Sequence, residues 1–289
     1  MRILVFGIGG LIGSTIFRIL SKNNEWKVYG TINASNPFAT DAYLKDRVLT
    51  NVNVLDHQSV GVLGKICPDV VINCVGLTKH HRAGSEVIAS VQLNSIWPNQ
   101  LNVLCKQVGA RLIQVSTDCV FSGRVGNYSE LDAPDALDIY GRSKILGEIH
   151  GDVNAITIRT STLGHEFKSR NGLLEWFLSQ RENCLGFKNA IFSGLPTIIL
   201  ADIIQNHIIP NPLLSGLYHI GAGPIDKFTL LNVISKKYKK DIVINPEFAF
   251  SINRSLCIDK FIADTGYKII GWDEMIDRMY IDYKQNNNV

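Results

Sequence analysis

Short apolar runs alternate with amphipathic segments along the first 160 residues of the chain. Strands buried on both faces of a parallel sheet have this pattern, with little polar alternation inside each run. Such runs lie at 2–6, 26–31, 52–56, 70–76, 111–117 and 155–159. The segments between them that read as helices are 14–22, 58–66, 86–109 and 140–150. This alternation predicts an α/β fold with a doubly wound parallel sheet of the Rossmann type.

The pattern loosens after Gly164. We expect helices at 173–180, 201–209, 229–238, 259–265 and 272–284, and strands at 190–197, 217–220 and 242–244. We therefore predict a dinucleotide-binding domain with a smaller C-terminal substrate-binding lobe. The domain spans 1–164, with 191–222 returning to it, and the lobe comprises 165–190 and 223–289.

A glycine-rich loop follows the first predicted strand. Gly7, Gly10 and Gly13 stand three residues apart and lead into a helix. In a dinucleotide site the first glycine lets the chain turn, the second lets backbone approach a pyrophosphate, and the third lets the helix pack on the strand. Free N–H groups at the helix start favour a phosphate. The loop therefore predicts a dinucleotide site, the alternative being a tight turn between packed elements.

The second predicted strand ends without the acidic residue that usually holds the ribose of NAD. The chain continues there through Ile32 and Asn33. An acid would repel the 2′-phosphate of NADP, so its absence favours NADPH, with NADH as the alternative. The candidate cofactor-binding residues are Gly7, Gly10, Leu11, Ile12, Gly13, Asn33, Asn53, Val54, Cys74, Val75, Gly76, Tyr140 and Lys144.

Catalytic candidates are a strand that ends in the hydroxyl of Thr117 and a helix that presents Tyr140 and Lys144 on one face. A nearby ammonium lowers the pKa of a tyrosine, which suits it to proton transfer at working pH. Tyr280 and Lys284 match the same spacing. That copy has no polar strand end upstream, and we expect a solvated helix face there.

Composition narrows the classes of protein. A formal net charge of +3 over 289 residues, without a basic stripe, predicts no nucleic-acid partner. No apolar stretch is long enough to predict a membrane span. Six cysteines without a Cys-x-x-Cys pair predict reduced thiols in a cytoplasmic protein. The His and Cys residues do not have the spacing of metal ligands, so we predict no metal site. A signal peptide is disfavoured because Arg18 interrupts the first apolar run.

Together these motifs resemble those of the extended short-chain dehydrogenase/reductases, and within them the dTDP-4-dehydrorhamnose reductase group. The resemblance covers nearly the whole chain. Its motifs are Gly7-x-x-Gly10-x-x-Gly13, Asn73, Asn94, Ser116-Thr117-Asp118-x-Val120-Phe121-x-Gly123, Tyr140-Gly141-x-Ser143-Lys144-x-x-Gly147-Glu148, Arg159-Thr160-Ser161 and Pro196-Thr197.

The resemblance implies NAD(P)H-dependent reduction of the 4-keto group of a nucleotide-linked 4-keto-6-deoxy-hexose, in deoxysugar and surface polysaccharide biosynthesis. Tyr140 would donate the proton, Lys144 would lower the pKa of Tyr140 and bind the nicotinamide ribose, and Thr117 would hydrogen-bond the keto oxygen. A homodimer is one option for the assembly.

Two departures from the family pattern bear on the sugar. Cys119 and Thr162 stand where the family usually has Tyr and Trp. An extra substituent, such as an acetamido group, would fit the space that these aromatic rings leave. The substrate is then dTDP-4-dehydrorhamnose or a UDP-linked acetamido-sugar analogue. The candidate substrate-binding residues are Thr78, Lys79, Asp118, Cys119, Thr162, Asn171, Pro196 and Arg254.

Three other functions compete with the reductase. A 4,6-dehydratase would resemble Thr-Asp-Glu at the catalytic strand, which Asp118 and Cys119 do not match. A nucleotide-sugar 4-epimerase uses the same Tyr and Lys, so it stays open. A non-catalytic regulatory subunit of this fold, similar to that of methionine adenosyltransferase, also stays open, although the intact Thr117, Tyr140 and Lys144 argue against it.

Overall fold

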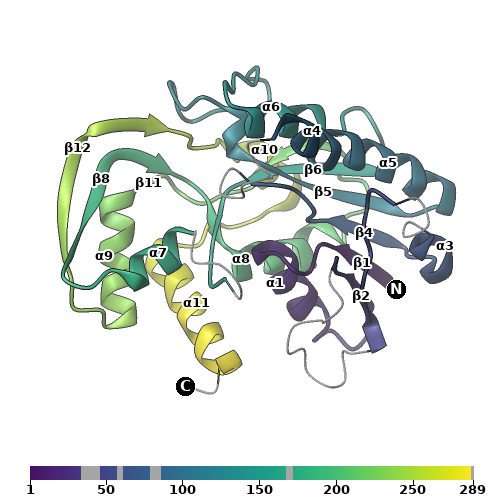
Figure 1. The fold of residues 1–289 in the computed structure, drawn as a ribbon, viewed down its shortest axis with the longest axis horizontal. Helices are drawn as coiled ribbons and strands as arrows, with labels where there is room; N and C mark the ends of the chain where they lie inside the picture. The colour runs from purple at the N-terminus through teal and green to yellow at the C-terminus, as the bar shows by residue number, and fades with distance from the viewer. Residues whose placement is uncertain (34–45, 57–60, 79–85, 167–171, 288–289) are drawn as a thin grey trace.

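A computed structural model describes residues 1–33, 46–56, 61–78, 86–166 and 172–287 of the chain. Within these ranges the largest feature is a seven-stranded parallel sheet in the order β10-β6-β5-β4-β1-β2-β3 (Figure 1). Its strands are β1 (Arg2–Phe6), β2 (Lys27–Thr31), β3 (Val48–Leu49), β4 (Val70–Asn73), β5 (Arg111–Thr117), β6 (Ala155–Thr160) and β10 (Gly216–His219). This order and parallel pairing confirm the predicted doubly wound sheet.

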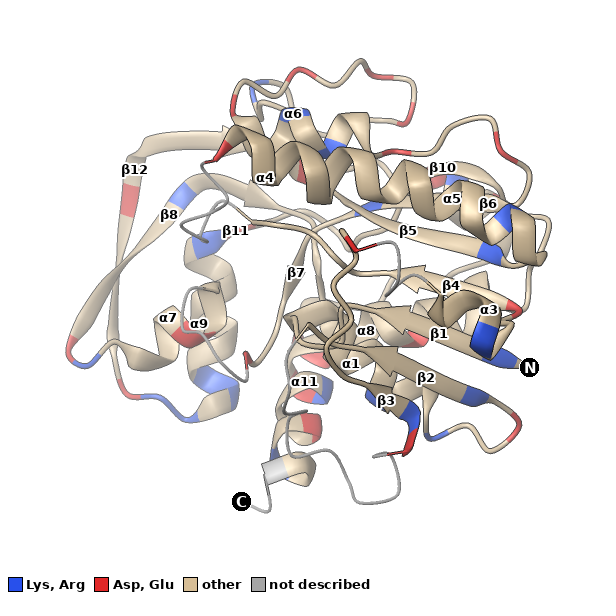
Figure 2. Cartoon of the chain, turned by 45° about the vertical axis from the view of Figure 1, so that its right-hand side comes forward, with Lys and Arg blue, Asp and Glu red and all other residues tan. Residues whose placement is uncertain are grey.

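Strand β1 shows why the central strands carry uninterrupted apolar runs. Its side chains alternate between two hydrophobic clusters: Ile3 and Val5 pack in one, Leu4 and Phe6 in the other. Helices cover both faces of the sheet, so neither set meets water. Charged side chains lie on helices and loops and at the starts of strands such as β1, β2 and β5, and few fall inside the central strands (Figure 2).

One layer of helices packs with the cluster that contains Ile3, and a second layer packs with the cluster that contains Leu4 (Figure 1). The first layer is α1 (Leu11–Leu20), α8 (Thr197–Ile203), α10 (Asp259–Thr265) and part of α11 (Trp272–Asn287). The second is α3 (Val62–Ile66) and α5 (Trp97–Val108). Helices α4 (Val87–Val91) and α6 (Ile139–Leu146) lie beside α5 (Figure 1).

A three-stranded sheet stands beside this core, in the order β11-β8-β12 (Figure 1). Its strands are β8 (Asn183–Phe192), β11 (Ile225–Asp226) and β12 (Val243–Asn253), and its helices are α7 (Leu173–Ser179) and α9 (Lys227–Tyr238). Phe177, Leu231 and Met279 share a hydrophobic cluster that joins these helices to α11. Strand β7 (Thr162–Leu163), which follows β6 in the chain, pairs in parallel with β9 (Leu195–Pro196), which follows β8.

Several elements differ from the sequence prediction. The strand predicted at 52–56 is wrong: this segment is irregular, and Val48–Leu49 forms the edge strand instead. The polar stretch before residue 190 is the first half of β8, and the short strand predicted at 242–244 extends to Asn253. Strands with one face in solvent carry polar residues, so an apolar-run criterion misses them.

The predicted helix 86–109 contains a π-helical segment, Gln92–Ile96, between α4 and α5. Helix α8 likewise continues into a π-helix, Ile204–Ile208. Among the residues that the structure describes, no helix is both long and apolar enough to cross a bilayer.

Candidate active site

The glycine loop brings backbone together where side chains would not fit. Gly7 has φ +85°, in the left-handed region. A Cβ on Gly13 would stand 2.3 Å from the Gly7 carbonyl oxygen, so only glycine lets α1 start this close to β1. Gly10 precedes α1 with no capping side chain among the described residues, and the first turn carries no acid. These open N–H groups form an anion-binding site of the kind that holds a pyrophosphate.

Two loops lie together at the end of β2. The Val52 N–H donates to the Ile32 carbonyl at 3.1 Å, which places Asn53 and Val54 beside Asn33 in the fold. Asn33 and Asn53 are exposed, and Val54 is buried. The side chain of Asn53 accepts a hydrogen bond from the backbone two residues on and closes a turn. The predicted ribose and adenine contacts therefore share one edge of the sheet.

The end of β4 packs directly on the glycine loop. A Cβ on Gly7 would meet Val75 Cγ2 at 3.0 Å and the Cys74 carbonyl carbon at 3.1 Å. A Cβ on Gly76 would stand 3.9 Å from Lys144 Nζ. Burial raises the pKa of Cys74 to about 12 although Lys144 acts to lower it. The thiol is therefore neutral, and it lies between the glycine loop and Lys144.

Helix α6 presents the catalytic tyrosine to the end of β5. Asp138 caps the helix by accepting the Gly141 N–H at 2.7 Å, which places Tyr140 in the first turn. The side chain of Thr117 is among the groups that act on the Tyr140 hydroxyl. Burial and the nearby Cys119 raise the pKa of Tyr140, and Thr117 opposes the rise. The expectation that Lys144 lowers this pKa is wrong here, because burial dominates; a protonated phenol suits a proton donor.

Lys144 is buried against the catalytic strand. Its side chain is 7 % exposed, and its Nζ donates to the Val115 carbonyl at 2.8 Å. Burial lowers the pKa of Lys144 to about 8, while Glu148 and Cys74 act to raise it. The ammonium is thus held one residue from the strand end that carries Ser116 and Thr117.

The π-helical segment positions an amide beside this lysine. Asn94 Oδ1 accepts the Leu77 N–H at 2.9 Å, and its Nδ2 donates to the Leu77 carbonyl at 3.1 Å and to Ser143 Oγ at 3.0 Å. A Cβ on Gly147 would stand 1.8 Å from the Asn94 carbonyl oxygen. Only glycine lets α6 approach this closely. π-Helical turns are frequent at functional sites, but no sequence signal placed one here.

On the substrate side, residues distant in the sequence meet. Arg254, at the end of β12, places Nη1 3.4 Å from Cys119 Sγ and donates from Nε to the Phe121 carbonyl at 2.9 Å. Asp118 is buried, and burial raises its pKa while the charge of Arg254 opposes the rise. The structure therefore brings Arg254, Asp118 and Cys119 together beside Tyr140.

Thr162 and Pro196 lie in the β7–β9 pair, where Thr162 is opposite Leu195 and Leu163 opposite Pro196. Thr160 pairs with Thr117 across β6 and β5, so Thr162 follows the catalytic strand end closely. Thr78 is exposed beyond β4. Lys79 and Asn171 lie outside the described residues.

Metal ligands are a separate question: no group of three or more His, Cys, Asp or Glu gathers in the described ranges.

The second Tyr/Lys copy lies on α11. Lys284 is exposed, as expected of a solvated face, but Tyr280 is half-buried and packs its ring against Tyr238 at a centroid distance of 4.8 Å. The predicted solvated face is therefore wrong for Tyr280. The sequence of α11 alone did not reveal that Tyr238 would pack against Tyr280.

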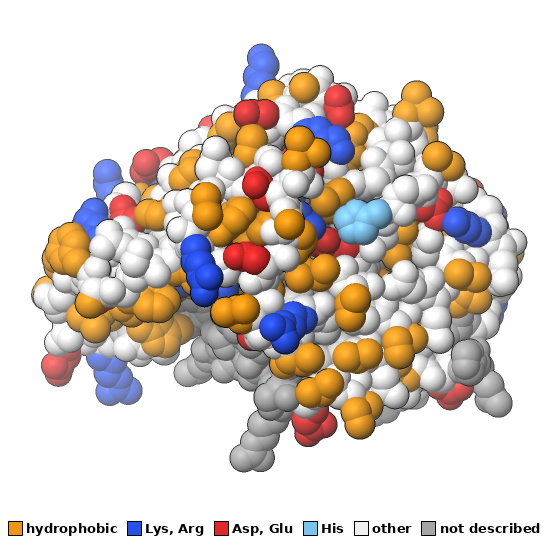
Figure 3. All heavy atoms as spheres, turned by 90° about the horizontal axis from the view of Figure 1, so that it is seen from above, with side chains coloured by type: hydrophobic (Ala, Val, Ile, Leu, Met, Phe, Trp, Pro, Cys, Tyr) orange, Lys and Arg blue, Asp and Glu red, His pale blue; other side chains and the backbone are white. Residues whose placement is uncertain are grey.

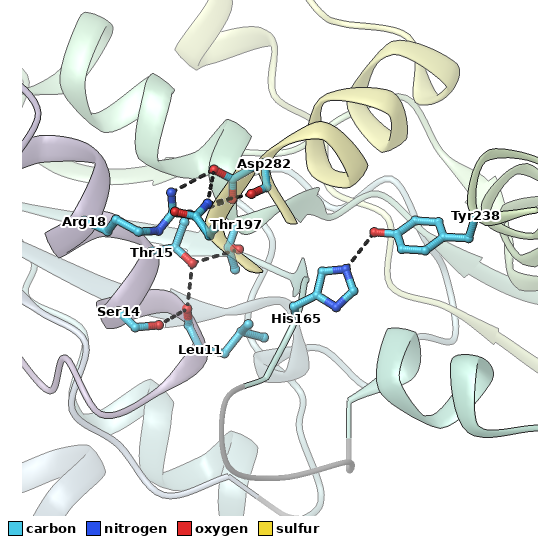
Figure 4. Close-up of polar contacts among 9 residues, drawn as sticks. Leu11, Ser14, Thr15, Arg18, His165, Thr197, Tyr238 and Asp282 are labelled. Atoms are coloured by element: carbon cyan, nitrogen blue, oxygen red, sulfur yellow. Dashed lines mark hydrogen bonds and ion pairs between the residues drawn. The ribbon is translucent and has the colours of Figure 1, made fainter. Parts of the chain in front are cut away.

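Contacts also join the cofactor helix α1 to the C-terminal helix. Arg18 forms a bidentate ion pair with Asp282, at 2.7 and 2.6 Å, and Thr15 Oγ1 lies 3.2 Å from Thr197 Oγ1 at the start of α8 (Figure 4). Helix α11 is therefore held against the last turn of α1, at the end of that helix away from the glycine loop.

A buried charged group below the site was missed by sequence reasoning. Glu148, Arg159 and His219 lie together beneath Ser116. The available signal was an arginine inside the otherwise apolar strand β6, since a fully buried charge needs a partner.

Comparisons with known proteins agree with this geometry. The family model described as "RmlD substrate binding domain" matches residues 1–251. The chain is 35% identical over 150 residues to methionine adenosyltransferase 2 subunit beta of Danio rerio, covering 51% of this chain and 42% of that protein. It thus spans less than half the length of that relative.

A second relative is dTDP-4-dehydrorhamnose reductase of Aggregatibacter actinomycetemcomitans, 25% identical over 232 residues, covering 77% of this chain and 74% of that protein. Among solved structures, dTDP-4-dehydrorhamnose reductase of Bacillus anthracis in complex with NADP aligns with a TM-score of 0.78 and 23% identity, covering 97% of this chain and 99% of that chain. This likeness supports the fold.

Proposed function

Because the chain belongs to the family of the RmlD substrate binding domain, we propose that it is an NADPH-dependent reductase of a nucleotide-linked 4-keto-6-deoxy sugar. The observation that carries the proposal is the convergence of Thr117, Tyr140 and Lys144 beside an open glycine loop. The loop fits a dinucleotide because glycine at position 13, where a Cβ would collide with the Gly7 carbonyl oxygen, lets the loop turn tightly into α1. NADPH, or NADH as the alternative, would supply the hydride.

The chain's own residues do the remaining work. Tyr140 donates its proton to the oxygen that becomes a hydroxyl. The raised pKa of Tyr140 keeps the phenol protonated until that step. Thr117 holds the same oxygen by a hydrogen bond. Lys144, fixed on the Val115 carbonyl, keeps a positive charge beside the site and binds the nicotinamide ribose. Asn33, Asn53 and Val54 contact the adenosine end.

The sugar is distinguished at Cys119 and Thr162. Both are smaller than the aromatic residues usual in the family, and Arg254 occupies the side of Cys119. We propose a sugar that fills this space with an acetamido substituent, on a UDP carrier, with dTDP-4-dehydrorhamnose as the alternative. Deoxysugar and surface polysaccharide biosynthesis in the cytoplasm is the setting that such a substrate implies.

A second function is a non-catalytic subunit. The match to a methionine adenosyltransferase subunit favours it, because that relative is 35% identical over 150 residues, about half of this chain. The presence of Thr117, Tyr140 and Lys144 together favours the reductase, since a partner-binding role does not need Thr117 beside Tyr140 or Lys144 held on the catalytic strand.

The test is NADPH oxidation by the purified protein, followed by nicotinamide absorbance, with dTDP- and UDP-linked 4-keto-6-deoxy sugars that carry or lack a 2-acetamido group. Tyr140→Phe should reduce kcat by about 10²–10⁴-fold while NADPH binding is kept. Tyr280→Phe, in the second Tyr/Lys copy, is the matched control and should keep kcat.

If NADPH binds but none of the sugars in the panel causes its oxidation, the reductase proposal is refuted. Interconversion of a sugar with its 4-epimer through bound NAD would then indicate an epimerase, and silence in both assays would favour the subunit.

The assembly is a further part of the proposal. Exposed apolar side chains gather over α4, α5 and α6 (Figure 3), and they include Ile88, Ile96, Val103 and Leu146. We propose that this face joins two copies in a homodimer. Light scattering on the eluted protein should give twice the chain mass, and Ile88→Glu should return it to the monomer mass.

The division into a cofactor domain (1–164 with 191–222) and a substrate lobe (165–190 with 223–289) is also a proposal. Arg254 supports it, because it reaches the catalytic strand from the second of these segments.

A further inference from the structure

The buried carboxylate of Glu148 is the centre of a network directly below the catalytic strand. Both of its oxygens face Arg159: Nε donates to Oε1 at 2.8 Å and Nη2 donates to Oε2 at 2.7 Å. The two side chains are 0 % and 2 % exposed. Hydrogen bonds from Arg159, together with those from Ser116 and His150, outweigh the effect of burial and lower the pKa of Glu148 to about 2. The carboxylate is therefore charged at every working pH.

The network reaches the end of the catalytic strand. Ser116, the neighbour of Thr117, donates its hydroxyl to Glu148 Oε1 at 2.7 Å. Glu148 itself follows α6, one helical turn beyond Lys144. One carboxylate thus joins the helix that carries Tyr140 and Lys144 to the strand that carries Thr117.

The opposite side of Arg159 is held as tightly. Its Nη1 lies 3.3 Å from His219 Nε2, and its Cζ lies 5.0 Å from the centroid of the Phe121 ring. Phe121 stacks on Tyr128 with ring centroids 4.1 Å apart. The guanidinium is enclosed by a carboxylate, an imidazole and an aromatic face, so the position of the carboxylate has little freedom.

We infer that Glu148 is a positioning residue of the active site: its buried carboxylate fixes α6 to β5 and supplies the negative charge that keeps Lys144 protonated. This inference rests on the proposed reductase in assigning Lys144 its task. It adds a residue that contacts neither sugar nor cofactor in that proposal.

The charges around Lys144 support the second half of the inference. Burial is the main effect that lowers its pKa, to about 8, and the groups that oppose burial are Glu148, just after α6, and Cys74, just after β4. Tyr140 lies on the same helix face, and the Val115 carbonyl of β5 accepts from Nζ. Because burial raises the pKa of Cys74 to about 12, that thiol is neutral, and Glu148 supplies the only full negative charge among these groups.

The experiment measures the lysine directly. Protein labelled with ¹³C in its lysine side chains is titrated by NMR, and Lys144→Met identifies the Lys144 resonance. Removal of the charge in Glu148→Gln should lower the pH at which Lys144 titrates by about one unit. Glu148→Asp, which keeps the charge but moves it, should lower it less. His150→Gln, which removes an exposed neighbour 3.6 Å from the same carboxylate, is the control and should change nothing.

Turnover gives a separate readout. Glu148→Asp and Ser116→Ala should each lower kcat about three- to tenfold, with little change in KM or NADPH binding, because the helix loses its fixed place on the strand. The alkaline limb of kcat in Glu148→Gln should move to lower pH together with the Lys144 titration.

An unchanged Lys144 titration in Glu148→Gln would overturn the inference. If that variant fails to fold, an unchanged titration in Glu148→Asp would do the same. The titration needs neither sugar nor hydride transfer, so a wild-type protein without reductase activity would refute the proposed function while the titration still decides the role of Glu148.

Discussion

The two sheets of this protein use similar strands in opposite surroundings. The strands at the centre of the seven-stranded sheet are buried on both faces, whereas most residues of β12 in the three-stranded sheet are exposed or half-buried. Polar side chains inside the central strands of the first are enclosed: Asn73, Gln114 and Arg159 are at most 2 % exposed. Apolar groups in the second lie open, with Phe248 61 % and Phe250 49 % exposed.

This difference shows where the molecule tolerates unfavourable chemistry. A buried polar group is costly unless it is hydrogen-bonded, so those of the large sheet are paired and concentrated near the catalytic strand. An exposed phenylalanine costs little stability, but it leaves an apolar surface that can associate with other proteins. A substitution should therefore have large effects at the first sheet and small ones on the outer face of the second.

The largest effect on stability is expected at Trp97, which is fully buried, packs edge-on against Phe6 at a centroid distance of 5.2 Å and donates to Asn73 Oδ1 at 3.1 Å. Trp97→Ala should lower the free energy of unfolding by about 3–5 kcal/mol, measured by urea titration. Trp176→Ala on α7, at a side chain that is 36 % exposed, is the matched control and should cost less than half as much. Equal costs would remove the contrast between the two regions.

Acid should act next, through Glu148. Its folded pKa, about 2, lies below its ordinary value of 4.5, so its contribution to stability is complete above pH 4.5 and is lost as the pH falls towards 2. The loss is on the order of 3 kcal/mol. Thermal unfolding of the wild type between pH 6 and 3 should show a steep fall in Tm. Glu148→Gln should show a shallower one, and parallel curves would contradict the assignment.

The ion pair between α1 and α11 should have an intermediate effect. Arg18 and Asp282 are 19 % and 17 % exposed, so solvent screens them in part. A double-mutant cycle with Arg18→Gln and Asp282→Asn should give a coupling of about 1 kcal/mol. A coupling near zero at low salt would show that the C-terminal helix is held by its apolar face alone.

The smallest effect is expected on the outer face of β12. Phe248→Ser should change the free energy of unfolding by no more than about 0.5 kcal/mol. Phe177→Ala, in the enclosed cluster beneath the same sheet, should cost about 3 kcal/mol or more. A large cost at Phe248 would mean that this face packs against protein in solution.

Much of the large sheet was predictable from the sequence. Strands β1 and β4 carry uninterrupted apolar runs because both faces are covered, and β5 and β6 are largely apolar for the same reason, so these segments stand out in the sequence. The glycine loop was predictable from its spacing, and the structure shows why glycine is needed there: a Cβ on Gly13 would stand 2.3 Å from the Gly7 carbonyl oxygen.

The tertiary structure alone decided three other features. Strand β8 and most of β12 face solvent on one side, so their polar residues resembled loops in the sequence. The rise in the pKa of Tyr140 comes from burial, which local spacing does not reveal. The approach of Arg254 to Cys119, and the enclosure of Glu148 by Arg159, join residues far apart in the chain or on separate elements.

Local pattern therefore determined most strands of the core, where the glycine-rich loop lies and which tyrosine and lysine share a helix face. These properties depend on neighbours within a few residues, which the sequence states directly. Proton affinities, the partners of buried charges and the wall of the substrate site depend on solvent exclusion and long-range contacts. Only the folded chain fixes those, because each requires several elements to meet at one place.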